Sequence, residues 1–83
     1  MIQAISDLMA RKDSEEVMEI SLFLNEVEQA LTGGTITQQE YAELMIDIEA
    51  LKKIIALKNN LELNQLIHKA VLGLIELAKL VKL

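Results

Sequence analysis

The stretch LTGGTITQQEY, residues 31–41, decides the fold of this chain because it can stop one helix and start another. Gly33 can adopt the left-handed backbone conformation that commonly ends a helix. The Thr37 hydroxyl can accept a hydrogen bond from the Glu40 amide, while the Glu40 carboxylate accepts one from the Thr37 amide. This reciprocal pair is the capping box of a helix start. The stretch therefore predicts a turn between two antiparallel helices.

A hydrophobic staple completes the predicted turn, since Ile36 can pack on Tyr41 across the start of the second helix. Such a contact fixes the angle at which the chain enters a helix. The predicted structural turn comprises Gly33, Gly34, Ile36, Thr37, Glu40 and Tyr41.

Apolar residues recur three and four positions apart on both sides of the turn, which is the period of a helix with one buried face. They predict helices over residues 14–32 and 38–57. The first stripe is Val17, Ile20, Leu24, Val27 and Leu31. The second is Tyr41, Leu44, Ile48, Leu51 and Ile55, broadened by Met45, Ile46, Ile54 and Leu57. Residues 2–11 form either a separate short helix or the beginning of the first one, because the stretch Asp13-Ser14-Glu15-Glu16 can cap a helix start after them.

The period fails at Lys58 and resumes in a new phase from Leu63. Between them lie Asn59 and Asn60, and asparagine both tolerates left-handed conformations and caps helix starts. We favour a second turn here, followed by a helix over residues 61–82. The alternative is one continuous helix that absorbs the change of phase as a stutter.

The predicted helix over residues 61–82 has only a narrow polar strip, so we expect other helices to cover it on several sides. Each helix of a three-helix monomer leaves one face to water. We therefore predict an all-α fold, an antiparallel helical hairpin plus a third apolar helix, with the bundle shared in a homo-oligomer, a dimer being favoured. The predicted interface residues are Leu66, Ile67, Val71, Leu72, Leu74, Ile75, Leu80 and Val81.

Composition favours one helical domain, because the 83 residues are 52% hydrophobic but only 2% aromatic, with no proline. The chain has no cysteine, which excludes disulfides and thiolate metal sites. We expect a cytoplasmic protein, since neither a signal peptide nor an apolar run near the ~20 residues of a membrane span is present.

Charge is unevenly placed along the chain. Residues 1–50 hold eleven acidic and two basic side chains, whereas residues 51–83 hold six lysines and two acids. We expect Glu15, Glu16, Glu19, Glu26 and Glu28 on the solvated face of the first long helix. Halves of opposite sign can attract each other and argue against a general polyanion binder.

The turn also resembles the end of an EF-hand calcium loop, with Glu40 at the last ligand position. Counting back from Glu40, the earlier ligand positions fall on Gln29, Leu31 and Gly33, which offer no carboxylate to a hard cation. His68 has no partner histidine or cysteine for a metal site. The hydroxyl side chains lie in no recognisable catalytic motif. We expect no metal, no cofactor and no enzyme activity.

Gly34, Ile36, Thr37, Glu40 and Tyr41 follow a Gly-x-Ile-Thr-x-x-Glu-aromatic pattern that resembles the turn of SHOCT (short C-terminal) domains. The resemblance covers a short part of the chain and implies a role in oligomerisation or protein contact. We expect a protein–protein interaction or assembly module, acting as an adaptor, regulator or structural subunit. Compact acidic helical proteins of this kind are frequent in phages and other mobile elements.

Two other functions stay open. An amphipathic helix over residues 68–83 could lie on a membrane surface, although it has no Trp or Phe anchor. The acidic face of the first long helix could inhibit a nucleic-acid-binding protein by imitating phosphates. Direct nucleic-acid binding is not expected, because the lysines of residues 68–83 come without arginine or stacking aromatics.

Overall fold

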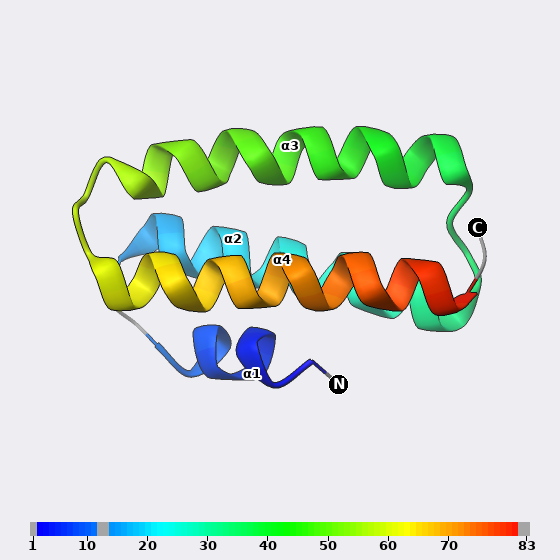
Figure 1. Ribbon diagram of the computed structural model, residues 1–83, viewed down its shortest axis with the longest axis horizontal. Coiled ribbons are helices and arrows are strands. Elements are labelled where there is room, and N and C mark those ends of the chain that lie inside the picture. The colour runs from blue at the N-terminus through cyan, green and yellow to red at the C-terminus, as the bar shows by residue number, and fades with distance from the viewer. Residues whose placement is uncertain (1, 12–13, 82–83) are drawn as a thin grey trace.

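The computed structural model describes residues 2–11 and 14–81, and this part of the chain is all-α with no strand (Figure 1). Its four helices are α1 (Gln3–Ala10), α2 (Glu15–Gly33), α3 (Gln38–Ala56) and α4 (Leu61–Val81). The segment before α2 is thus a separate short helix. Each of the three long helices begins or ends within one residue of its predicted bound, and residue 82 lies outside the described residues.

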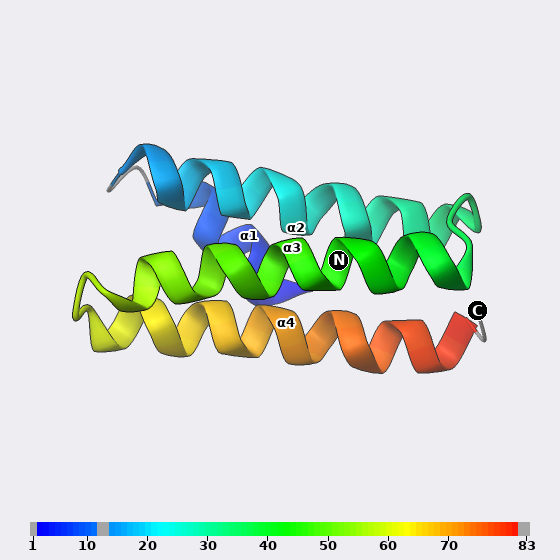
Figure 2. The same cartoon turned by 90° about the horizontal axis from the view of Figure 1, so that it is seen from above.

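Helices α2 and α4 run side by side in the same direction and form the middle layer in Figure 1, whereas Figure 2, seen from above, shows one on either side of α3. We call them the central pair. Helix α3 runs antiparallel to both and packs on one side of this pair. Helix α1 packs across the opposite side and contacts both α2 and α4, but not α3. The central pair is therefore covered on two sides within one chain.

The core contains the apolar faces of all four helices. Its buried side chains are Ile5, Leu8, Val17, Ile20, Leu24, Val27, Leu31, Ile36, Ile48, Ile55, Leu63, Ile67, Ala70, Val71 and Leu74. Helix α3 contributes only Ile48 and Ile55 to this fully buried set. Three residues predicted to broaden the buried face of that helix are instead exposed: Ile46, Ile54 and Leu57.

The start of the chain is anchored on the central pair by Ile2. Its backbone N–H donates a 2.7 Å hydrogen bond to Oε2 of Glu28, whose side chain is only 2% exposed. The prediction that Glu28 lies on the solvated face is therefore wrong, because this carboxylate serves the backbone of a neighbouring segment. A Cβ atom at Gly73 would lie 2.8 Å from Cγ2 of Ile2, so the glycine permits this close approach.

The turn between α2 and α3 contains the predicted capping box. The Thr37 N–H donates to Oε1 of Glu40 at 3.0 Å, and the Glu40 N–H donates to the Thr37 hydroxyl oxygen at 3.1 Å. The left-handed residue is Gly34, with φ of 67°, and not Gly33, which is the last residue of α2. The prediction was one residue early because Gly33 still fits the helical conformation.

A second turn separates α3 from α4, so the continuous helix is excluded. Asn59 has a left-handed φ of 55°, which reverses the direction of the chain after α3. Oδ1 of Asn60 accepts a hydrogen bond from the Leu63 N–H at 3.0 Å and caps the start of α4. Each asparagine thus supplies one of the two properties that favoured a turn here.

Candidate interaction surface

The eight residues predicted as an interface on α4 do not share one environment. Ile67, Val71 and Leu74 are 0%, 3% and 0% exposed, so they belong to the interior of the single chain. Leu66 and Ile75 are half-buried, whereas Leu72, Leu80 and Val81 are exposed. The three interior residues are therefore removed from the predicted interface.

Helix α1 contributes to this correction, because it packs on both α2 and α4 within the same chain. Ile5 and Leu8 of α1 are both 0% exposed, so they complete the core from within the same chain. The apolar face of α4 is therefore covered largely by other helices of the same chain.

A different helix carries the longest row of exposed apolar residues. Ile46, Ala50 and Ile54 of α3 and Leu57, which follows its last residue, are spaced four, four and three positions apart, which aligns them along one face. Ile46, Ile54 and Leu57 are 69%, 51% and 81% exposed. We call these four residues the outer stripe, since they face away from the core residues Ile48 and Ile55. In Figure 1, α3 lies at the upper edge of the molecule, with no helix beyond it.

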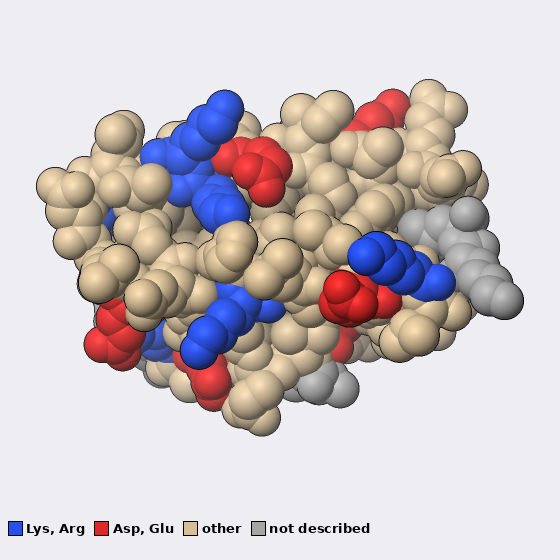
Figure 3. Space-filling model, viewed as in Figure 1, with Lys and Arg blue, Asp and Glu red and all other residues tan. Residues whose placement is uncertain are grey.

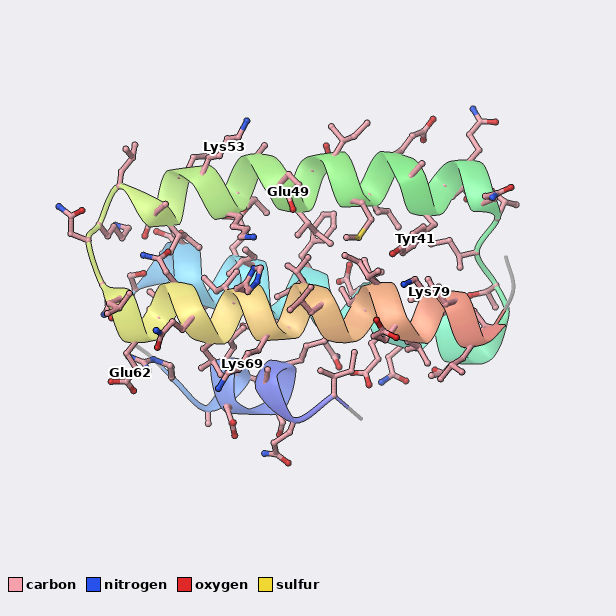
Figure 4. The ribbon with its side chains drawn as sticks, viewed as in Figure 1. Tyr41, Glu49, Lys53, Glu62, Lys69 and Lys79 are labelled. Atoms are coloured by element: carbon pink, nitrogen blue, oxygen red, sulfur yellow. The ribbon has the colours of Figure 1, made fainter. Side chains whose placement is uncertain are left out.

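Charged residues flank the outer stripe with opposite signs at its two ends. Glu43 and Asp47 lie exposed in the first half of α3, and Lys53 lies exposed in its last turn. Lys53 projects away from the other helices (Figure 4). The space-filling view shows lysine side chains gathered at the end of α3 that leads into α4 (Figure 3). The surface around the stripe is thus an acidic segment followed by a basic one.

The predicted turn residues serve the start of α3. Ile36 is 9% exposed, and Tyr41 is half-buried, which raises the pKa of its hydroxyl. Hydrogen bonds from the Thr37 amide and hydroxyl lower the pKa of Glu40, because they stabilise its carboxylate. The Glu40 carboxylate is therefore a helix cap. Among residues 2–11 and 14–81, no three His, Asp or Glu side chains are placed to hold a metal ion together.

His68 lies exposed beside an open hollow on α4 that is lined by Asn64, Gln65, His68 and Lys69. Nδ1 of His68 lies 3.3 Å from Nζ of Lys52 on α3. The site thus gathers amide, imidazole and amine groups and offers no carboxylate to orient the imidazole. These groups can form hydrogen bonds with solvent or a ligand.

The acidic residues of α2 divide into three environments. Glu15, Glu19 and Glu26 are exposed, as predicted, and Glu28 is buried. Glu16 lies 3.6 Å from Nζ of Lys58. The pKa of Glu16 is lowered mainly by a hydrogen bond with its own backbone amide and then by the charge of Lys58. Only the first three carboxylates are therefore fully available on the outside of α2.

The outer stripe is the feature that sequence analysis missed. Its spacing was visible, but Ile46 adjoins Met45 and Ile54 adjoins Ile55, so both were assigned to the neighbouring buried face. A second row of apolar residues opposite the first is the pattern that indicates a helix with two covered sides.

Comparison of the chain with protein-family models, curated proteins and solved structures found no match. In the described part of the chain, no helix combines the length and the apolar character that crossing a membrane requires. The outer stripe is the most distinctive apolar feature on the described surface of the protein.

Proposed function

We propose that this chain is a small, non-enzymatic interaction or assembly module that binds protein through the outer stripe of α3. The observation that carries the proposal is the exposure of Ile46, Ile54 and Leu57 in one row. Single exposed aliphatic side chains are ordinary on protein surfaces. Residues four positions apart on a helix are neighbours, however, so this row presents a continuous apolar ridge. Such ridges are typical of surfaces that another protein covers.

Three hydroxyl groups of α2 and its cap support a non-enzymatic role, because they form hydrogen bonds with the backbone of that helix. The Ser14 hydroxyl accepts from the Val17 N–H at 3.3 Å and caps α2. The Ser21 hydroxyl donates to the Met18 carbonyl at 2.8 Å, and the Thr32 hydroxyl donates to the Glu28 carbonyl at 3.1 Å. A nucleophilic hydroxyl would instead face a general base.

The resemblance of the Gly34 to Tyr41 segment to a SHOCT turn supports the same class of function, since it implies oligomerisation or protein contact. Adaptor, regulator and structural subunit are all roles of such a module. The outer stripe replaces the predicted α4 interface, because α4 uses Ile67, Val71 and Leu74 in the core.

Site-specific photo-crosslinking in cells that produce the protein tests this function. The photoreactive residue, a small aliphatic diazirine that preserves close helix approach, replaces Ala50, at the centre of the outer stripe, or Glu26, on the exposed side of α2, as the matched control. We expect discrete protein adducts from position 50 that disappear in an Ile46→Lys/Ile54→Lys background, and none from position 26. The proposal fails if position 50 gives no discrete adduct or if the lysine substitutions leave its adducts unchanged.

The two alternative functions use other surfaces. A membrane-surface protein would rely on exposed apolar residues of α4 such as Leu72 and Leu80. An acidic inhibitor would rely on Glu15, Glu19 and Glu26 of α2. Liposome flotation that depends on Leu72 and Leu80 would favour the first alternative. Salt-sensitive competition with DNA for a basic protein would favour the second.

A further inference from the structure

We propose that the partner of the outer stripe is a second copy of this chain, bound antiparallel around a two-fold axis that passes beside Ala50. This inference rests on the proposed function and specifies its partner. An isologous contact requires a surface that is complementary to itself, and the outer stripe meets this requirement in both shape and charge.

The shape of the stripe is symmetric about its centre. Ile46 and Ile54 lie four residues before and four residues after Ala50. A two-fold axis at Ala50 therefore places Ile46 of one copy beside Ile54 of the other. The small Ala50 side chains meet at the crossing point and allow the two helix axes to approach closely. Rows of residues four apart on both helices interdigitate in the commonest class of helix packing.

Charge selects the antiparallel orientation. In that orientation the exposed acids Glu43 and Asp47 of each copy lie alongside the segment of the other that carries Lys53. A parallel pair would instead place acids beside acids and lysine beside lysine, which is unfavourable. Glu49 lies four positions before Lys53 on the same helix, an arrangement in which the two side chains can pair within the chain, whereas Glu43 and Asp47 have no lysine or arginine three or four positions away along α3. These two acids are therefore available to basic side chains of a second chain.

The arrangement of the helices permits this contact without rearrangement. Helix α1 lies on the opposite side of the α2–α4 pair from α3, so the core stays complete when α3 meets another α3. The stripe spans the twelve residues 46–57, whose eleven steps of about 1.5 Å make about 17 Å of helix. Such a contact falls at the small end of specific interfaces, so we expect a weak dimer that forms in the micromolar range.

Sedimentation equilibrium across the micromolar range tests the dimer with charge-reversed variants of the full chain. Glu43→Lys/Asp47→Lys makes the flanks of the stripe basic, and Lys53→Glu makes them acidic. Each variant alone should dimerise on the order of tenfold more weakly than the wild type. An equimolar mixture should recover association, because a heterodimer then joins basic flanks to acidic flanks. Ile46→Lys/Ile54→Lys should be monomeric at every concentration measured.

Glu26→Lys is the matched control, since it changes the charge of an exposed helix position on α2 without touching α3. It should dimerise as the wild type does, and circular dichroism should show the same helicity for all variants. The dimer is refuted if the wild type stays monomeric at high micromolar concentration, or if the mixture associates no better than its components. It is refuted equally if Ile46→Lys/Ile54→Lys still dimerises.

Photo-crosslinking at position 50 separates failure of this inference from failure of the proposed function. An adduct of twice the mass of the chain supports the dimer. Adducts only of other masses refute it while leaving the function as an interaction module intact. The absence of any adduct overturns both.

Discussion

Replacing Leu8 by Ala tests whether the eight-residue helix α1 is a packed part of the core. The Leu8 side chain is 0% exposed. The substitution removes three carbon groups, which corresponds to about 2.4 kcal/mol at ~0.8 kcal/mol each. The cavity left behind adds to this loss, and buried leucine-to-alanine changes cost about 2–5 kcal/mol in total. Since a domain of this size is stabilised by about 4–12 kcal/mol, the change removes a large share of its stability.

Detachment of α1 limits how far Leu8→Ala can lower the unfolding free energy. If the free energy of docking α1 is smaller than the cost of the cavity, α1 leaves the α2–α4 surface in the variant. The unfolding free energy then falls by no more than the docking free energy of α1. Unfolding then exposes less new surface, so the dependence of the unfolding free energy on urea becomes shallower. Both results require α1 to be docked in the wild type.

Urea titrations followed by far-ultraviolet circular dichroism measure both quantities for the wild type, Leu8→Ala and Met9→Ala. Met9 is the matched control, because it adjoins Leu8 on α1 but is 39% exposed. We expect Leu8→Ala to lower the unfolding free energy by at least about 2 kcal/mol and Met9→Ala by less than about 1 kcal/mol. Equal losses for the two variants would refute the packing of α1.

Four further predictions concern the turn between α2 and α3 and the orientation of α3. Thr37→Ala should lower the unfolding free energy by about 1 kcal/mol, whereas Gln39→Ala should leave it nearly unchanged. The pKa of Glu40 is lowered in the folded state. The carboxylate therefore stabilises the fold above its unfolded pKa, and this contribution is lost as pH falls through the folded pKa. In thermal melts, the destabilisation caused by Glu40→Gln should vanish at acid pH. Gly34→Ala should destabilise the protein by about 1 kcal/mol, because φ is 67° at that position. Gly33→Ala should not, because Gly33 has a helical conformation. Stabilisation by Gly34→Ala would contradict the assigned turn. Ile48→Lys, at a fully buried position, should unfold the protein, but Ile46→Lys on the outer stripe should change the melting temperature little, and equal damage from both would contradict the orientation of α3.

The turns were predictable from sequence because their determinants are local. Thr37 and Glu40 are three residues apart, and so are Asn60 and Leu63, so each pair can form its hydrogen bonds whatever the rest of the chain does. The left-handed residue was misplaced by one position, from Gly34 to Gly33, because a glycine pair offers the same conformational freedom twice.

The orientation of α3 could not be read from the sequence with the same certainty. Its apolar residues fall on two faces, and periodicity alone does not say which face meets α2 and α4. Packing selects the side of Ile48 and Ile55 and leaves Ile46 and Ile54 outside. The candidate surface is thus a consequence of tertiary structure, even though its spacing is written in the sequence.

The sequence by itself determined that the chain is all-α. It also determined the two turns that join the three long helices, because helix period and capping act over a few neighbouring positions. Only the tertiary structure decided that α1 folds back onto α2 and α4, because this contact joins residues far apart in the chain. The same contact places Ile2 on Gly73 and its backbone N–H on Glu28. By packing on α2 and α4 from within the chain, α1 adds Ile5 and Leu8 to the core, while Ile46 and Ile54 of α3 stay exposed.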